Sequence, residues 1–158
     1  MVTSRRPSLP RRHRRTGSAA AGRLFVDSSG WIALVSARDQ HHAEAHERFE
    51  AAAAQRRRLI TTNLVLAETH RLLLFRAGPQ AARRVLDRLE ASTLLTIEFA
   101  TAAHHRAALA WLDRLPDQRI SYTDAVSFAV MEATACPTAI GFDGDFVVAG
   151  FSLWRPAG

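Results

Sequence analysis

Four acidic residues of this sequence stand at the ends of apolar stretches or inside them, where charged side chains are uncommon. They are Asp27, Glu68, Asp124 and Asp143. Carboxylates packed together repel one another and raise each other's pKa values. Divalent cations remove that repulsion, and Mg²⁺ or Mn²⁺ prefers such oxygen ligands. If these four side chains converge, they favour cation binding, and a pair of such ions can clamp a phosphodiester and activate water for in-line attack.

The first of these acids follows a short stretch that favours a strand. Residues 23–26 read Arg-Leu-Phe-Val, Asp27 comes next, and a small-residue turn at 28–30 opens an apolar helix pattern over 31–35. In an α/β domain, ligand crevices form at the carboxyl ends of buried strands, so an acid placed there faces an opening in the sheet. Asp is also a preferred helix N-cap, and this stretch alone favours neither role over the other.

Asp143 has a comparable place at the end of a strand predicted over residues 138–142. An ordinary Asp-Gly turn at 143–144 explains the residue equally well in isolation. Asp145 lies two residues further along and is a possible fifth ligand.

Asp124 begins an apolar helix pattern that runs through Met131. Ser121 and Asp124 form the S-x-x-D capping pattern, which by itself explains both residues. Asp124 is nevertheless the only acid in a stretch of small and apolar residues, so we expect it to project from the first turn of a buried helix.

Glu68 lies inside a helix predicted over residues 64–76, with Asn63 as a plausible cap. Apolar residues surround this helix almost completely, so we expect it to be buried. A buried carboxylate is costly unless a charge or a metal pairs with it. A salt bridge with the nearby Arg71 is the competing explanation for Glu68.

Strand and helix patterns alternate along the chain. Strands are predicted at 23–26, 58–62, 94–99, 138–142 and 151–154, and helices at 31–35, 41–55, 64–76, 80–92, 101–115 and 121–131. This alternation predicts an α/β fold: one domain over residues 23–158, with a mainly parallel central sheet of four or five strands and helices on both faces.

Arginine supplies all 21 basic side chains, and the absence of lysine excludes a P-loop lysine, Schiff-base chemistry and a lysine general base. The formal charge of +6 resides in residues 1–22, which hold six arginines and no acid; the remainder is formally neutral. We expect residues 1–22 to form a disordered Arg-rich arm. The arm could tether RNA, but its composition favours a dispensable tail or a mis-assigned start.

Cys136 has no partner for a disulfide, so we expect a small buried thiol and a cytoplasmic protein. The sequence contains no apolar run near the length of a membrane span. His42 and His46 have the i, i+4 spacing of a zinc-binding helix, but no Glu directly follows the first His, so we expect both on the surface. His104 and His105 have no acid or cysteine partner at metal spacing and are also expected on the surface.

The stretches that carry the acids resemble motifs of the PIN-domain ribonucleases, specifically the VapC-type toxins of bacterial toxin–antitoxin pairs. The matching segments are Leu-Phe-Val-Asp-Ser-Ser at 24–29, Thr-Asn-x-Val-Leu-Ala-Glu at 62–68, Ser-Tyr-Thr-Asp-Ala at 121–125 and Gly-Phe-Asp-Gly-Asp-Phe at 141–146. The resemblance covers about residues 23–154 and leaves the Arg-rich arm outside. By position, the four acids match the family's acidic quartet, and Asp145 falls where relatives often carry a His or another polar residue. Ser28, Asn63 and Thr123 match supporting polar positions.

The resemblance implies an endoribonuclease that hydrolyses RNA with a water activated by Mg²⁺ or Mn²⁺, acting as the toxin of a type II toxin–antitoxin system. It further implies a homodimer, a cognate antitoxin that covers the acidic groove, and a structured RNA target such as tRNA or rRNA. The alternative is a catalytically inactive PIN-like module that binds RNA or protein. A complete quartet speaks against that alternative, because degenerate members usually lose one or more acids.

Overall fold

The computed structural model describes residues 22–157. The predicted arm, residues 1–22, therefore lies outside the described residues except for Gly22. Among the described residues, no helix is both long enough and apolar enough to cross a membrane.

The centre of the fold is a parallel sheet of five strands in the order β3-β2-β1-β4-β5. The strands are β1 Leu24–Val26, β2 Leu59–Thr62, β3 Leu95–Glu98, β4 Thr138–Ile140 and β5 Ser152–Leu153. The chain adds β2 and β3 on one side of β1, and β4 and β5 on the other. The predicted parallel sheet is confirmed, and its order reverses between β1 and β4, where open α/β sheets form their ligand crevices.

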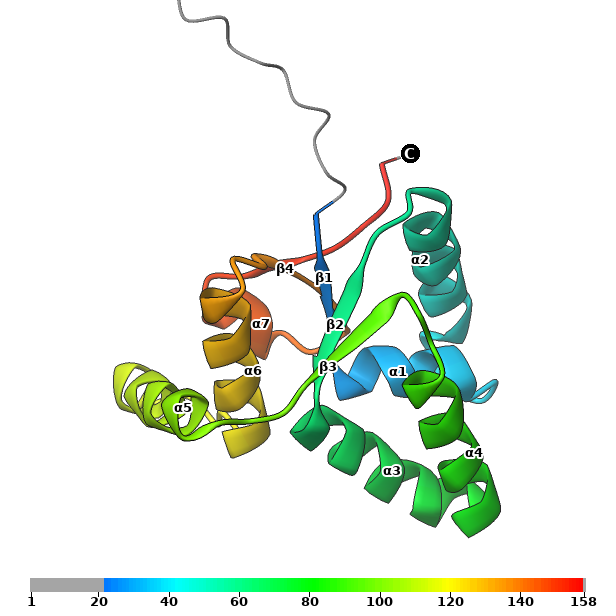
Figure 1. The fold of residues 1–158 in the computed structure, drawn as a ribbon, viewed down its shortest axis with the longest axis horizontal. Helices are drawn as coiled ribbons and strands as arrows, with labels where there is room; N and C mark the ends of the chain where they lie inside the picture. The colour runs from blue at the N-terminus through cyan, green and yellow to red at the C-terminus, as the bar shows by residue number, and fades with distance from the viewer. Residues whose placement is uncertain (1–21, 158) are drawn as a thin grey trace, which may run out of the picture.

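Helices cover both faces of this sheet, as predicted. They are α1 Ser28–Val35, α2 His42–Ala54, α3 Asn63–Ala77, α4 Pro79–Glu90, α5 Ala102–Arg114, α6 Tyr122–Ala133 and α7 Asp145–Val148. Figure 1 shows α5, α6 and α7 on one side of the strands and α1, α2 and α4 on the other, with α3 leaving the end of β2.

The main core cluster includes the central strands, residues of α1 and α2 such as Trp31 and Ala52, and the buried face of α6 with Phe128. The rings of Phe25 and Phe146 have centroids 6.0 Å apart, and those of Phe128 and Phe146 meet edge to face at 5.2 Å. Cys136 is buried as predicted, and its thiol donates a hydrogen bond to the Arg23 carbonyl. This packing fixes β1 and α6, the two elements that hold Asp27 and Asp124.

The prediction for α3 was wrong in one respect, because the helix is buried on one side only. Val65, Thr69 and Leu73 face the core, whereas the side chain of Phe75 is 78% exposed. The helix packs against α1 and α4 along a single face. Apolar composition alone did not indicate which faces other elements cover.

The N-cap of α3 is Thr62 and not Asn63, which corrects a second prediction. The Thr62 hydroxyl accepts a hydrogen bond from the Val65 amide. Asn63 begins the helix, and its side-chain oxygen accepts from the amide of Ala100 at 2.9 Å. Asn63 therefore ties α3 to the chain that leaves β3.

His42 is half-buried, whereas the sequence predicted a surface position. A ring nitrogen of His42 lies 2.7 Å from the Ala33 carbonyl, which links α2 to α1. His46 is exposed as expected.

Gly30 provides the closest approach between α1 and β4. A Cβ atom at this position would lie 2.7 Å from the carbonyl oxygen of Ile140. We therefore expect Gly30→Ala to lower the free energy of unfolding by about 1–3 kcal/mol, as overpacking does in a close-packed interior.

Urea unfolding measures this effect, and Gly144→Ala is the matched control. A Cβ at Gly144 meets nothing within 4 Å, and the backbone there has φ −71° and ψ −13°, which alanine adopts readily. The control should unfold like the wild type or slightly later. Equal stability of the two variants would show that the contact with β4 is not restrictive.

Candidate metal centre

Two acids lie where the strand order reverses. Asp27 follows β1 directly, and Asp143 follows β4 after a short turn. The turn passes close to Asp27, because a Cβ atom at Gly141 would lie 3.2 Å from the Cβ of Asp27. The topology thus brings acids separated by more than a hundred residues to the same edge of the sheet.

A hollow of about 360 Å³ opens at this edge. Its lining includes all four acids predicted from the sequence together with Asp145. Carboxylate oxygens of Asp124, Asp143 and Asp145 lie within 4.8 Å of one another. The structure therefore gathers the predicted acids around one space, and their function as metal ligands stays a prediction.

Asp27 has the most restricted side chain of this group, at 3% exposed. Its Oδ2 accepts hydrogen bonds from the amide and the hydroxyl of Ser29, at 3.1 and 2.7 Å. Its Oδ1 is buried and has no hydrogen-bond partner among the described residues. Burial raises the pKa of Asp27, and the charge of Glu68 raises it further. Asp27 is thus both the helix cap and a carboxylate with one free buried oxygen.

Asp124 shows the same division between its two oxygens. Its Oδ2 accepts from the hydroxyl of Ser121 at 2.6 Å and from the Ser121 amide at 3.3 Å, which completes a capping box. Burial raises the pKa of Asp124 to about 6, and the charges of Asp27 and Asp143 add to this effect. The capping interaction therefore occupies only one oxygen of Asp124, a residue that also lines the hollow.

Glu68 is half-buried in α3 and lines the hollow. The competing salt bridge with Arg71 is absent among the described residues, and the Arg71 guanidinium lies 5.9 Å from the centre of the Phe75 ring. Glu68 is close enough to Asp27 for its charge to raise the pKa of Asp27, and no ion pair among the described residues includes Glu68. Its position is explained by the acidic cluster and not by an ion pair along the helix.

Asp145, which the sequence offered only as a possible fifth ligand, lies close to Asp124 and Asp143. Its amide donates to Asp143 Oδ1 at 3.0 Å. Burial raises the pKa of Asp145, as does the charge of Asp143.

The three predicted supporting residues lie in different surroundings. Ser28 is buried and lines the hollow. Asn63 bonds Ala100 and Thr123 offers its carbonyl to Ser127, and neither lines the hollow. Ser29, which the sequence did not single out, has the supporting role at Asp27.

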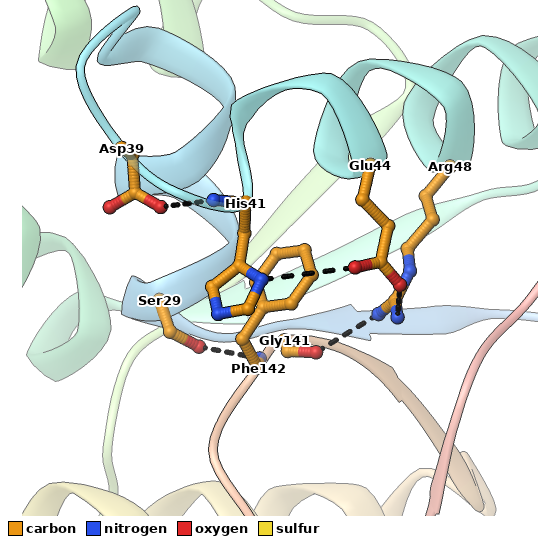
Figure 2. A network of polar contacts seen from close by, with 7 residues as sticks. All are labelled: Ser29, Asp39, His41, Glu44, Arg48, Gly141 and Phe142. Atoms are coloured by element: carbon orange, nitrogen blue, oxygen red, sulfur yellow. Dashed lines mark hydrogen bonds and ion pairs between the residues drawn. The ribbon is translucent and has the colours of Figure 1, made fainter.

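Sequence reasoning also missed Arg48, a buried cation on α2 that is 3% exposed. Its Nη1 donates to the carbonyl oxygen of Gly141 at 3.0 Å, and its Nη2 pairs with Glu44 (Figure 2). The guanidinium carbon lies 4.5 Å from the centre of the Phe142 ring. The Glu44–Arg48 spacing of i, i+4 is the sequence signal of the pair, but it is equally typical of a solvated helix face.

Phe142 is held from two further directions. The ring of His41 stacks on it at 4.3 Å with an interplanar angle of 9°. The Phe142 amide donates to the hydroxyl of Ser29 at 3.0 Å, and this hydroxyl itself donates to Asp27 (Figure 2 shows the contact with Phe142). The turn that precedes Asp143 is therefore fixed to α1 and α2, and Ser29 connects it directly to Asp27.

A divalent cation suits this donor set. The hollow offers carboxylate oxygens from several elements, one of which is a buried and unpaired Asp27 oxygen. Hard cations such as Mg²⁺ and Mn²⁺ are bound by carboxylates of this kind. The raised pKa values of Asp27 and Asp124 indicate that their negative charges are poorly compensated by the protein alone.

The raised pKa values predict how stability depends on pH without metal. For Asp124, the ordinary pKa is 3.8 and the folded value about 6, so folding favours the protonated form. The stability that the protonated Asp124 carboxyl contributes to the folded protein is fully present below the ordinary pKa, and it is lost as the pH rises through about 6. In EDTA at neutral pH, we expect the free energy of unfolding of Asp124→Asn to be about 1–2 kcal/mol higher than that of the wild type. This difference should vanish near pH 4.

Thermal unfolding at a series of pH values measures this difference. Asp113→Asn is the control, because Asp113 is exposed on α5 and lies away from the hollow. This variant should follow the wild type throughout. A pH-independent difference for Asp124→Asn would contradict the account.

The contacts of Arg48 predict that it holds the turn before Asp143 in place. Arg48→Met keeps apolar bulk but removes the donor to Gly141, so we expect faster amide hydrogen exchange at Phe142 and a loss of about 1–3 kcal/mol in unfolding free energy. Glu44→Gln is the control, since it retains Arg48 and its bond to Gly141. Unchanged exchange at Phe142 in Arg48→Met would show that the other contacts suffice.

Comparison with known proteins accords with this geometry. The family model described as "PIN domain" matches residues 24–152. The 23S rRNA-specific endonuclease VapC20 of Mycobacterium tuberculosis, from strains CDC 1551 and H37Rv, is 39% identical over 133 residues, which are 84% of this chain and 98% of VapC20. The crystal structure of Mycobacterium tuberculosis VapC20, described as a sarcin-ricin loop cleaving toxin, superposes with a TM-score of 0.76 at 38% identity and covers 84% of this chain and 99% of the other. The resemblance seen in the four motifs is thereby confirmed, and the chain belongs to the PIN-domain family, in its VapC-type branch.

Proposed function

We propose that this protein is an endoribonuclease that hydrolyses RNA phosphodiester bonds with the help of Mg²⁺ or Mn²⁺. The observation that carries the proposal is the gathering of the four predicted acids and Asp145 around one hollow, with a buried Asp27 oxygen left unpaired. An inactive binding module would have no need to keep this costly group of carboxylates. The similarity to the VapC20 endonuclease supports the same choice.

Each acid has a role that follows from its surroundings. Asp27 and Asp124 would hold the principal ion, because each has one oxygen fixed by a serine and both line the hollow. Asp143 and Asp145 would complete the site, because their carboxylate oxygens lie within 4.8 Å of each other and of an Asp124 oxygen. Glu68 would orient the attacking water by accepting its hydrogen bond. A cation held by these residues would supply Lewis acidity and lower the pKa of a water bound to it.

Ribosomal RNA is the substrate that the comparisons support. VapC20 is named as a 23S rRNA-specific endonuclease, and this chain spans nearly all of its length. Of the two classes expected from the resemblance, tRNA and rRNA, we therefore propose rRNA for this protein.

The partners and the location follow from membership of the VapC type. We propose a cognate antitoxin that covers the acidic hollow, a homodimer and a cytoplasmic location. The exposed ring of Phe75 on α3 supports an interaction surface, since large apolar side chains in contact with water favour association. The Arg-rich residues 1–22 would add salt-sensitive affinity for RNA without taking part in the chemistry.

Removal of charge from the hollow should abolish cleavage. We expect Asp27→Asn and Asp124→Asn to lower the rate of 23S rRNA cleavage by about two orders of magnitude or more, because asparagine keeps the shape but weakens cation binding. EDTA should have the same effect on the wild type, and added Mg²⁺ or Mn²⁺ should restore activity. Primer extension across the cleaved RNA provides the measurement.

Asp113→Asn is the matched control for this experiment, because it removes one carboxylate charge from the exposed face of α5. It should cleave like the wild type. Full cleavage by a folded Asp27→Asn protein, or by the wild type in EDTA, would contradict the mechanism and favour the binding module.

A further inference from the structure

A second polar hollow lies beside the acidic one. It has a volume of about 500 Å³ and is lined by Ser36, Arg38, Asp39, Gln40 and Arg76. Two of these residues, Asp39 and Arg76, also line the acidic hollow. The two spaces therefore adjoin, and a chain molecule could occupy both.

The arginines around these two hollows form no ion pair with an acid among the described residues. Arg38 and Arg76 line the second hollow, Arg119 lines the acidic one, and all three are exposed. The ion pairs among the described residues involve other cations. Such guanidinium groups are available to an anion from solution.

Helix electrostatics explains only one of these positions. Arg76 lies in the last turn of α3, where a cation interacts favourably with the helix dipole. Arg38 and Arg119 lie in connections between helices, so this explanation does not apply to them. A shared ligand accounts for all three.

The three arginines come from three separate parts of the chain. Arg38 follows α1 and Arg76 ends α3, while Arg119 precedes α6. Figure 1 shows α1 on one side of the strands and α6 on the other. Arg76 and Arg119 line the acidic hollow itself, and Arg38 lines the adjoining one.

A nucleic-acid strand needs cations in these places. The hollow itself is acidic and repels a polyanion, so ions held by the carboxylates and cations beside them must together attract the backbone. Guanidinium groups match phosphate oxygens in charge and in their forked geometry. Ser36 and Gln40 add hydrogen-bonding groups that could contact sugar or base.

We propose that Arg38 and Arg76 form a phosphate-binding subsite for the RNA strand on one side of the scissile bond, and that Arg119 holds the strand on the other side. This inference rests on the proposed endoribonuclease function and names the residues that position its substrate. The strand then runs from the second hollow, across the acids, toward the start of α6.

Equilibrium binding of a short single-stranded RNA to the full-length protein tests the subsite. The measurement uses the Asp124→Asn background, in which turnover is prevented, and a series of salt concentrations. Arg38→Ala, Arg76→Ala and Arg119→Ala should each weaken binding about tenfold, as the loss of a charge-assisted contact does. Each should also reduce the slope of log affinity against log salt by about 0.7.

Arg71→Ala and Arg106→Ala are the matched controls. Arg71 lies on α3 with Arg76, Arg106 lies on α5, both are exposed, and neither lines the two hollows. Each control removes the same charge and should change binding little. Equal losses in control and subsite variants would overturn the proposal, because they would indicate attraction by net charge alone.

Steady-state cleavage of 23S rRNA separates this proposal from the proposed function. In the otherwise wild-type protein, Arg38→Ala and Arg76→Ala should raise KM about tenfold and leave kcat nearly unchanged. Normal KM values in both variants would overturn the subsite while leaving the nuclease assignment intact. Arginine-dependent RNA binding without any wild-type cleavage would instead contradict the proposed function and retain the subsite.

Discussion

The mutual repulsion and burial of carboxylates at one edge of the sheet is the constraint on which the site depends. Asp27 is almost fully buried, Asp124 is nearly so, and both have raised pKa values. Such a group is costly to maintain in a folded protein unless cations bind to it. The surrounding structure fixes Asp27 and Asp124 through serine contacts, and these two acids line one hollow together with Glu68, Asp143 and Asp145.

Two devices keep the acids in place. Capping interactions with Ser29 and Ser121 hold one oxygen of Asp27 and of Asp124, so that helix formation itself orients these side chains. The turn before Asp143 is held from outside the sheet by the buried Arg48 and by the stacking of His41 on Phe142. The acids are thereby preorganised on α1, α6 and a braced turn, a condition for efficient metal-assisted chemistry.

Much of this arrangement could be predicted from the sequence. Strand patterns that end in Asp27 and Asp143 predicted both acids at the carboxyl edge of a parallel sheet, and both lie there in the folded chain. The cap interpretation is confirmed for Asp27 and Asp124, each through one oxygen, and the ligand interpretation stays a prediction. The cap of α3 was misplaced by one residue because Thr62 and Asn63 are both good capping residues.

Other features depend on tertiary contacts that no local pattern contains. Arg48 resembles a surface residue in sequence, and only its approach to Gly141, far along the chain, explains its burial. The exposed face of α3 and the half-burial of His42 likewise depend on which elements pack nearby. The arginines beside the acids lie in two connections, at Arg38 and Arg119, and at one helix end, at Arg76. Their proximity is therefore visible only in the folded chain.

The most direct test of the central claim is anomalous diffraction from crystals of the wild-type protein soaked in Mn²⁺. The account predicts an anomalous peak in the acidic hollow, within about 2.0–2.5 Å of carboxylate oxygens that include Asp27 Oδ1 and an oxygen of Asp124. The same soak of Asp27→Asn crystals should give a weaker peak or none. A well-ordered wild-type hollow without manganese, or manganese bound only elsewhere, would contradict the claim that these carboxylates are gathered to hold a cation.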